Sequence, residues 1–396
     1  MVEKKFYGER LRNARMFRGL TLTELAKRTD ISKQSLSLYE NDNNVPDYSR
    51  VRALAIELNF PFEYFFQKDN YISKTETTYF RSFASATKKD RTAQSIKLEY
   101  VAKMYEILLE YISFPEMNLP SIDFVGYDDV FECESIDAVQ EIENIADQVR
   151  EYWGIGSAPI KDLQYLLEKN GIIVTGFDTN EDKIDAFSQR TIVENDDVYF
   201  IAVALGDRPE GRIRFDMAHE LGHILLHPWS EDLETITKEE FKARERQANM
   251  FASAFLLPKD SFGKDVASYP TDLKYYLFLK NKWKVSIQAM IYRAHQLNII
   301  SDNQYQYLMR QVSKHGWRLK EPGDVPYPLN ENIFQGAIDI LIEQNIFTAK
   351  DIISLFKKNG VTLYSQDMEE LLHLRPDTLK VEEKIIPILS LRKSEE

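Results

Sequence analysis

Residues 6–66 fall into five short apolar patterns, each with the spacing of a helix that buries one face. Thr21 followed three residues later by Glu24 is a capping-box signature, which predicts that a helix begins directly after Thr21. Ser32 can cap the next helix, over residues 33–40. The pattern predicts an all-helical N-terminal unit in which a tight turn separates two consecutive short helices.

The pattern changes after this unit. A polar stretch rich in Ser and Thr leads into a helical run over residues 95–112, which Pro115 and Pro120 close. We interpret residues 69–120 as a linker and a connecting helix. The apolar stripe of that helix is expected to pack against the rest of the chain or against a second chain.

Apolar runs in the middle of the chain predict a small sheet. Residues 171–177, GIIVTGF, and residues 197–205, DVYFIAVAL, are rich in β-branched and aromatic residues, as buried strands are. The patterns that follow are helical and cover residues 244–258, 271–313 and 330–374, with a Pro/Gly-rich break at 321–328. We therefore expect a mainly α fold with a small β-sheet, of the α+β class.

Three of the six histidines lie in one nine-residue window, HELGHILLH, residues 219–227. His219 and His223 stand four residues apart, so on a helix their imidazoles project from one face and can hold one zinc ion. Glu220 lies beside them, where it can act as general base on a metal-activated water. The alternative is a helix whose histidines are ordinary buried polar groups, but their clustering favours the HExxH interpretation.

A catalytic zinc ion needs a third protein ligand. Glu245 stands at the front of the apolar stripe over residues 244–258, where an antiparallel helix could aim it at the histidines. It could equally be a solvated charge in a first helical turn, and the spacing favours neither reading. His227 is rotated away from the histidine pair, which indicates a packing or supporting role. His295 and Tyr292 are further candidates, although a structural role is commoner for such residues.

The amino-acid composition limits the classes of protein to which this chain can belong. The 396 residues are 43% hydrophobic and 29% charged, as in a globular protein with room for two or three domains. No apolar run approaches the roughly 18 residues of a membrane span, and the first residues lack the apolar stretch of a signal peptide. The one cysteine, Cys133, excludes an internal disulfide and suits a reducing compartment, so we expect a cytoplasmic protein.

The net charge of −13 is unevenly distributed. Residues 1–68 hold 12 Lys or Arg and 9 Asp or Glu, a net charge of +3, so the remainder carries −16. Only the N-terminal unit therefore has the sign of charge that favours nucleic acid.

Two segments together resemble the ImmA/IrrE family of zinc metallopeptidases: RFDMAHELGHILLH, residues 214–227, and ERQANMFASAFLLP, residues 245–258. Residues 142–174 also look like the two helices and the strand with which that family's domain opens. The resemblance implies a zincin-like metallopeptidase domain, which we place at residues 121–270. Asp216 departs from the family, which more often has a hydroxyl or neutral residue there.

The resemblance also implies roles for single residues. His219, His223 and Glu245 would be the ligands of a Zn²⁺ ion, and Glu220 would be the catalytic residue. The substrate class that it implies is a repressor-type protein.

The segment TLTELAKRTDISKQSLSLYEND, residues 21–42, resembles the XRE-type helix-turn-helix of phage repressors. It implies a DNA-binding domain at residues 1–68. Lys33, Gln34 and Ser37 share the outward face near the start of the second helix, where base edges are read in such domains. A role in protein interaction alone is the alternative for this unit.

Arginines on the first predicted helix are candidates for contacts to DNA phosphates. They are Arg12, Arg15 and Arg18. An ordinary solvated helix face is an equally good reading for any one of them.

These expectations describe a cytoplasmic zinc metalloendopeptidase joined to a DNA-binding domain, which regulates transcription by cleaving a repressor. Its partners would be duplex DNA at an operator-like site, a repressor-type protein and a second copy in a homodimer, but no membrane. The helical C-terminal region, residues 271–396, has no assigned role. The alternative is a DNA-binding regulator that cleaves nothing and whose zinc domain senses a signal or a partner. An antitoxin-like or immunity regulator would share all these residues.

Overall fold

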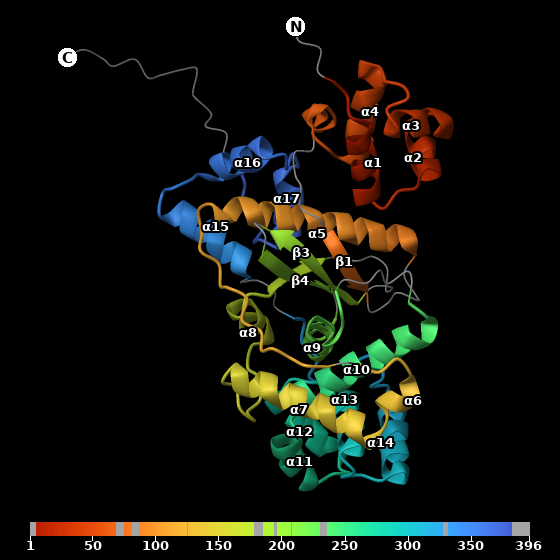
Figure 1. Cartoon of the computed structure of the whole chain (residues 1–396), viewed down its shortest axis with the longest axis vertical. Coiled ribbons are helices and arrows are strands. Elements are labelled where there is room, and N and C mark those ends of the chain that lie inside the picture. The colour runs from red at the N-terminus through yellow and green to blue at the C-terminus, as the bar shows by residue number, and fades with distance from the viewer. Residues whose placement is uncertain are drawn as a thin grey trace, which may run out of the picture.

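The computed structural model describes residues 5–68, 75–80, 87–124, 126–177, 185–193, 196–206, 208–229, 236–327 and 332–381. Over these residues the chain is mainly helical, with a four-stranded mixed sheet whose strand order is β1-β3-β4-β2. Figure 1 shows helices on both sides of this sheet, with α5 and the C-terminal helices on one side and α9 on the other. The predicted fold class, mainly α with a small sheet, is confirmed.

The N-terminal unit has the predicted helices, which are α1 (Gly8–Phe17), α2 (Leu22–Thr29), α3 (Lys33–Glu40), α4 (Tyr48–Leu58) and the 3₁₀ helix η1 (Phe62–Phe66). The capping box at α2 is formed, since the Thr21 hydroxyl accepts from the Glu24 N–H and the Glu24 carboxylate accepts from the Thr21 N–H. The Ser32 hydroxyl accepts from the Ser35 N–H at the start of α3. Asp30 makes the tight turn between them in the left-handed conformation, with φ of 54°.

The sheet contains two strands that the pattern predicts and two that it does not. The strands are β1 (Thr75–Phe80), β2 (Ile173–Phe177), β3 (Ala186–Val193) and β4 (Asp196–Ala204). β2 runs parallel to β4, while β3 is antiparallel to both β4 and β1. The apolar pattern does not reveal β3 because it buries Ser188, Gln189 and Thr191. β1 lies in the stretch that we interpreted only as a linker.

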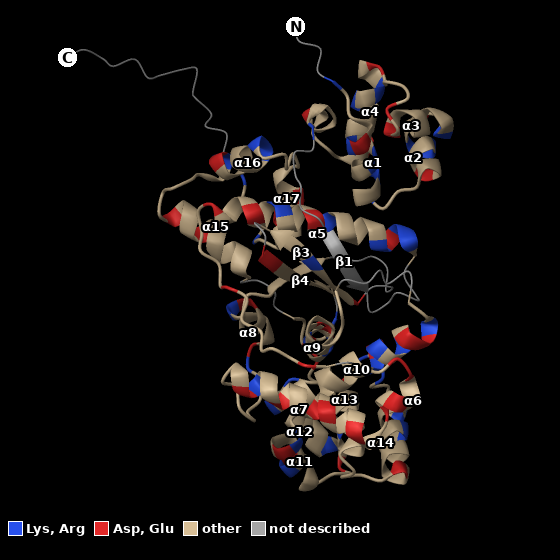
Figure 2. Ribbon diagram, viewed as in Figure 1, with Lys and Arg blue, Asp and Glu red and all other residues tan. Residues whose placement is uncertain are grey.

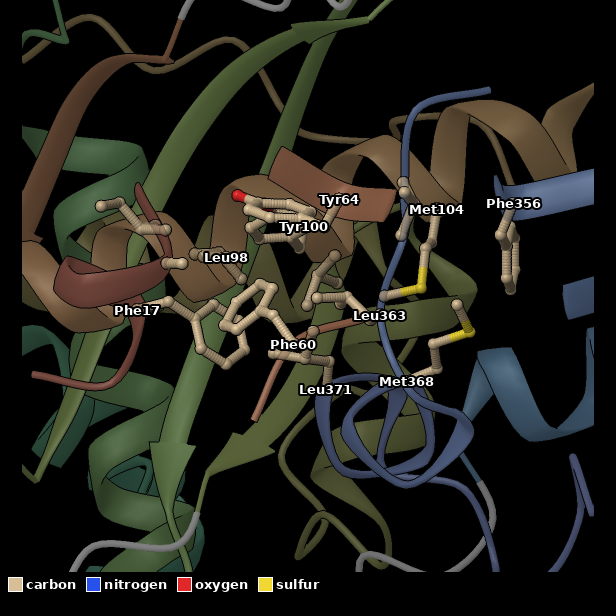
Figure 3. Close-up of a cluster of buried hydrophobic side chains, with 14 of the residues drawn as sticks. Phe17, Phe60, Tyr64, Leu98, Tyr100, Met104, Phe356, Leu363, Met368 and Leu371 are labelled. Carbon is tan, nitrogen blue, oxygen red and sulfur yellow. The ribbon is translucent and has the colours of Figure 1, made fainter. Parts of the chain in front are cut away.

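One apolar core joins the N-terminal unit to parts of the chain that are distant in sequence. It contains α5 (Lys88–Leu109), one face of the sheet, and the C-terminal helices α15 (Ile333–Glu343), α16 (Ala349–Lys358) and α17 (Ser365–Leu372). Figure 3 shows Phe17 and Phe60 of the N-terminal unit beside Tyr100 of α5 and Leu371 of α17. The hydroxyls of Tyr64 and Tyr100 lie 2.7 Å apart within this core. The N-terminal unit is therefore packed on the rest of the molecule and is not held by the linker alone.

A second core lies on the other face of the sheet. Its helices are α7 (Ile136–Tyr152), α8 (Leu163–Lys169), α9 (Glu210–Leu226), α10 (Lys238–Leu256), α11 (Lys259–Ala267), α12 (Leu273–Trp283), α13 (Ile287–Gln296) and α14 (Asp302–Lys314). The short helix α6 (Val130–Cys133) packs against α7 and α10. The apolar side chains of α12, α13 and α14 belong to this core. The helices just after residue 270 thus complete the unit that holds α9, and our domain boundaries stay a prediction.

Buried arginines fasten the helix ends in this second core. The Arg214 guanidinium on α9 donates to the carbonyl oxygens of Ile160 and Lys161. Arg293 on α13 donates to the carbonyl oxygen of Leu257 and forms an ion pair with Glu143 on α7. The two guanidinium groups thus supply hydrogen bonds to main-chain carbonyl groups just before α8 and just after α10. Within the described residues, no helix is long and apolar enough to cross a membrane.

Candidate metal centre

The site forms where α9 and α10 approach each other closely. A Cβ atom at Gly222 would lie 3.1 Å from the Cα of Ala248 and 3.2 Å from the ring of Phe251, so only glycine allows this separation without movement of α10. The close approach brings the first half of α10 against the histidine face of α9. The resulting contact joins Glu245 to His219 and His223.

Three predicted side chains meet at one point. The Nε2 atoms of His219 and His223 lie 3.0 Å apart. The Glu245 carboxylate reaches His223 Nε2 at 3.1 Å and His219 Nε2 at 3.4 Å. One ligand atom from each of the three residues lies within 4.8 Å of the others. Both histidines are buried, whereas the Glu245 side chain is 18% exposed, so Glu245 is the member of the cluster that is in partial contact with solvent.

The tautomer of His219 is determined by an amide on α10. His219 Nδ1 lies 3.2 Å from the Asn249 side-chain oxygen, and the Asn249 amide nitrogen donates to the Glu245 carbonyl oxygen at 2.7 Å. An amide oxygen can only accept, so His219 Nδ1 carries the proton and Nε2 presents a lone pair toward Glu245. That is the form in which an imidazole binds a metal ion.

The tautomer of His223 is determined in the same way, by His227. Their Nδ1 atoms lie 2.9 Å apart, and His227 Nε2 lies 3.3 Å from the Gln247 side-chain oxygen. Burial, and next the nearby His223, hold the pKa of His227 well below its ordinary value, so His227 is neutral. His227 therefore donates to Gln247 through Nε2 and accepts from His223 through Nδ1, which leaves His223 Nε2 as a lone pair.

His227 was predicted to have a packing or supporting role, and these contacts are consistent with it. Sequence reasoning did not identify two other residues that contact the histidine rings. Asn249 and Gln247 each face one of the histidine rings from α10. Their signal in the sequence is a pair of amides, QAN, inside an otherwise apolar helix stripe. A buried amide there needs a hydrogen-bonding partner, which the histidines supply.

The carboxylates of the site differ in their surroundings. Burial raises the pKa of Glu245, but the imidazoles of His219 and His223 beside its carboxylate outweigh burial and hold that pKa well below its usual range. Glu245 is therefore ionised, as a metal ligand must be. The Glu220 carboxylate accepts a hydrogen bond from the Ser188 hydroxyl of β3, with Ser188 Oγ 2.6 Å from Glu220 Oε2. Glu220 is fully buried between α9 and the sheet.

The other candidate residues from the sequence, His295, Tyr292 and Cys133, are not part of the His219–His223–Glu245 cluster. His295 Nε2 pairs with Asp302 at 2.7 Å, and its ring stacks on Tyr305, so it is part of the α13–α14 contact. The Tyr292 ring lies beneath the Arg246 guanidinium, 5.9 Å from its centre. Burial, more than the acidic neighbours, raises the pKa of the Cys133 thiol. The thiolate form of Cys133 is therefore disfavoured, as expected of a buried packing residue.

The predicted DNA-contacting residues fall into two groups. Lys33 and Gln34 are exposed at the start of α3, and Ser37 is half-buried one turn further on. Arg15 instead forms a two-pronged ion pair with the buried Glu40, at 2.6 and 2.8 Å, and also donates to the Leu20 carbonyl oxygen. These contacts favour the structural reading of Arg15.

The other two arginines of α1 also have partners within the chain. Arg12 donates to the Glu40 carbonyl oxygen and to the Asn41 side chain at the rim of the unit, and it stays half-exposed. Arg18 donates to the Leu58 and Asn59 carbonyl oxygens and pairs with Asp367 of α17 at 2.7 Å. Arg18 therefore faces the C-terminal helices, which favours its structural reading over a phosphate contact.

The family comparisons agree with both halves of this description. Residues 168–295 match the IrrE N-terminal-like domain, and residues 8–70 match a helix-turn-helix domain. Among curated proteins, none matches the chain significantly. The chain therefore combines a helix-turn-helix domain with a domain similar to the IrrE/ImmA type, as the sequence resemblance predicted.

Proposed function

We propose that this protein is a zinc-dependent endopeptidase of the HExxH type, in which a helix-turn-helix domain binds duplex DNA and the peptidase site cleaves a repressor-type protein. The observation that carries the proposal is the meeting of His219 Nε2, His223 Nε2 and the Glu245 carboxylate at one point. Asn249 and His227 support it, because they leave both Nε2 atoms as lone pairs.

The donor set fits zinc. Two imidazole nitrogens and one carboxylate are a known catalytic combination, which leaves a fourth coordination position for water or substrate. A bound zinc ion would supply Lewis acidity, which polarises a peptide carbonyl and lowers the pKa of a water molecule. His219, His223 and Glu245 would hold it, and the partial exposure of Glu245 agrees with access from solvent.

Glu220 supplies the proton transfer in this proposal. Its carboxylate takes a proton from the attacking water and later delivers it to the amide nitrogen of the leaving strand. The hydrogen bond from Ser188 holds Glu220 Oε2 and thereby orients the carboxylate. This position near the histidines, away from the metal-binding atoms of the cluster, suits a base better than a ligand.

The DNA-binding part of the proposal rests on the exposed end of α3. Figure 1 shows α3 on the outer side of the N-terminal unit, away from α16 and α17. Lys33 and Gln34 project from that exposed helix end. A duplex could therefore reach α3 while the unit stays docked on α5 and α17.

The test compares wild type with Glu220→Gln, which preserves side-chain shape but removes the base. We expect zinc-loaded wild type to cleave a repressor encoded nearby, with the cut mapped by mass spectrometry. The variant should keep its zinc and its DNA affinity, while cleavage falls by several orders of magnitude. Equal cleavage by the two proteins would remove Glu220 from the mechanism.

The second candidate function is a sensor that binds DNA and cleaves nothing. The shared core favours it, because α5 and the C-terminal helices connect the helix-turn-helix unit to the sheet that supports Glu220. In that case Glu220→Gln would regulate its target genes as well as wild type does. Lys33→Ala combined with Gln34→Ala would not.

A further inference from the structure

The start of α5 lies against the helix-turn-helix unit, beside the first turn of α2. Lys89 of α5 forms an ion pair with Glu24 of α2 at 3.3 Å. Further along α5, the Tyr100 hydroxyl contacts that of Tyr64, and the Tyr100 ring packs edge-on against Phe17, with ring centres 5.6 Å apart. The start of α5 therefore has a fixed position relative to the helices of this unit.

This end of α5 is rich in basic residues. Three of the four residues 88–91, KKDR, are Lys or Arg. Lys88 is exposed, and the paired side chains of Lys89 and Glu24 are 37% and 43% exposed. An ion pair as exposed as this one contributes little to stability, and positive charge in the first turn of a helix is unfavourable for the helix itself. The stability of the fold therefore does not explain why this turn is basic.

The position of these lysines matches the path of a DNA strand. In a helix-turn-helix, the second helix enters the major groove and the first helix crosses the sugar–phosphate backbone. Here α2, which ends at Thr29, is the first helix, and α3, which begins at Lys33, is the second. The eight residues of α2 span about 12 Å, close to the width of the major groove. A duplex with α3 in its groove would therefore bring a backbone strand past the first turn of α2, beside Lys89.

The exposed cations of α2, α3 and α5 form one surface. Figure 1 shows the start of α5 directly below α2, and Figure 2 shows basic residues at that end of α5. Lys27 on α2 and Lys33 on α3 are also exposed. In a chain with a net charge of −13, a polyanion is attracted most to the place where exposed cations gather.

We propose that the first turn of α5, through Lys88 and Lys89, contacts phosphates of the DNA strand that α2 crosses. The DNA-binding surface then extends past the helix-turn-helix domain into the connecting helix. The inference rests on the proposed DNA binding by α3. The ligand at this position is the sugar–phosphate backbone of duplex DNA, so the contact adds affinity without reading the base sequence.

Substitutions in the full chain test this contact. Lys88→Gln with Lys89→Gln removes two positive charges and keeps residues that favour a helix. The matched control, Lys259→Gln with Lys264→Gln, makes the same change in net charge on the exposed side of α11. Figure 1 shows α11 at the opposite end of the molecule from the helix-turn-helix unit. The probe is a fluorescent duplex of mixed sequence, because phosphate contacts need no particular bases.

The readout is the dependence of DNA affinity on salt, measured by fluorescence anisotropy. Each phosphate contact contributes roughly 0.9 to the slope of log affinity against log salt concentration. We expect the α5 variant to lose about 2 from this slope and to bind about tenfold or more weakly at about 0.1 M salt. The α11 control should keep the slope of wild type. An α5 variant with the slope and affinity of wild type would overturn the proposal.

Glu24→Gln separates a phosphate contact from a merely structural role. A Gln at this position still completes the capping box, so α2 keeps its start. If Lys89 only holds α5 against α2, loss of the Glu24 charge should weaken DNA binding as much as the α5 substitutions do. If Lys89 contacts phosphate, loss of the competing carboxylate should leave the affinity equal to that of wild type or higher. Equal weakening by both variants would assign Lys89 to the fold and reject the contact.

Lysine acetylation gives a second measurement that needs no substitution. With the duplex bound, Lys88 and Lys89 should react several-fold more slowly than in the free chain, as should Lys33, with the sites mapped by mass spectrometry. Lys259 on α11 should react equally in both states. Protection of Lys33 without protection of Lys88 and Lys89 would show that DNA does not reach α5.

The two proposals fail in different ways. A wild-type chain that binds no duplex even at low salt would reject DNA binding altogether. A chain that binds duplex and is weakened by Lys33→Ala with Gln34→Ala, but not by the α5 substitutions, would retain binding by α3 and reject the contact with α5.

Discussion

At the scale of single residues, the candidate site depends on which nitrogen of each histidine carries the proton. Asn249 and His227 contact the Nδ1 atoms of His219 and His223, so both Nε2 lone pairs point to Glu245. An unsupported imidazole could rotate or adopt the other tautomer. We therefore expect residues that would not touch a bound metal ion to control its affinity.

His227→Ala tests this control. Loss of the acceptor for His223 Nδ1 should weaken zinc binding by about 10- to 100-fold, the usual effect of removing such a supporting group. A competition titration with a chelator measures the change. His315→Ala, at an exposed histidine stacked on Trp317, is the control and should leave the affinity unchanged. Equal affinity of His227→Ala and wild type would remove His227 from the site.

A second titratable residue, Glu168, affects the stability of the fold and is not part of the candidate metal site. Burial raises the pKa of Glu168 on α8 to about 8, although Gln164 donates a hydrogen bond to it. Since this pKa is higher in the folded chain than in the unfolded chain, the contribution of Glu168 is fully present at low pH. It is lost as the pH rises from about 4.5 to about 8.

Glu168→Gln should therefore stabilise the metal-free protein at pH 8, by roughly 2 kcal/mol or more, because one pKa unit corresponds to about 1.4 kcal/mol. At pH 4.5 the two proteins should differ little. Denaturant unfolding at both pH values measures the difference, with Glu151→Gln at an exposed position as the control. A stability gain that is the same at both pH values would contradict the assigned cause.

At the scale of elements, the C-terminal helices hold the helix-turn-helix unit in place. Arg18 of α1 makes its ion pair with Asp367 of α17, and Arg10 of the same helix donates to the Gly360 carbonyl oxygen. Asp367 is buried, with 7% of its side chain exposed. The last helices of the C-terminal region, α15–α17, which had no assigned role in the sequence, are thus a support for the helix-turn-helix unit.

Asp367→Asn should loosen this support, because it leaves the mostly buried Arg18 without its counter-charge. We expect the free energy of unfolding to fall by about 1–3 kcal/mol and the amides of α1 to exchange faster. Glu57→Gln is the matched control, since it breaks the more exposed pair with Arg28 and should cost about 0–1 kcal/mol. Equal effects of both substitutions would mean that the Arg18 pair is not a docking contact.

At the scale of the whole molecule, the charge distribution restricts how DNA can approach. The chain carries −13 overall, and Figure 2 shows acidic and basic segments mixed over most helices. The N-terminal unit, with its small positive excess, therefore belongs to a molecule that is negative overall. DNA affinity should depend strongly on salt and on the few basic and polar groups at the exposed end of α3.

Lys33→Ala combined with Gln34→Ala should lower the affinity of the full chain for its DNA site by about tenfold or more. It should also flatten the dependence of affinity on salt, because one phosphate or base contact by a lysine is lost. Gel-shift titrations at several salt concentrations measure both effects, and zinc content, which should not change, is the control. A DNA affinity that changes neither with salt concentration nor with the double substitution would favour a protein-interaction role for this unit.

Much of this protein follows from the sequence by itself. The capping box at Thr21 and the cap at Ser32 are local hydrogen bonds between near neighbours, so the chain encodes them without tertiary contacts. The spacing of His219 and His223 places both rings on one helix face for the same reason. Strands β2 and β4 are also predictable, because strands buried on both faces are continuously apolar.

The tertiary structure alone decides the rest, since it depends on contacts between distant segments. Glu245 could be a solvated charge until α10 crosses α9 at Gly222 and brings it to the histidines. Arg18 looks like a phosphate contact until Asp367, far away in sequence, pairs with it. β1 is a polar linker by composition and becomes a strand only because β3 offers unpaired backbone groups beside it. A pairing partner that is distant in the sequence leaves no local pattern in the segment with which it pairs.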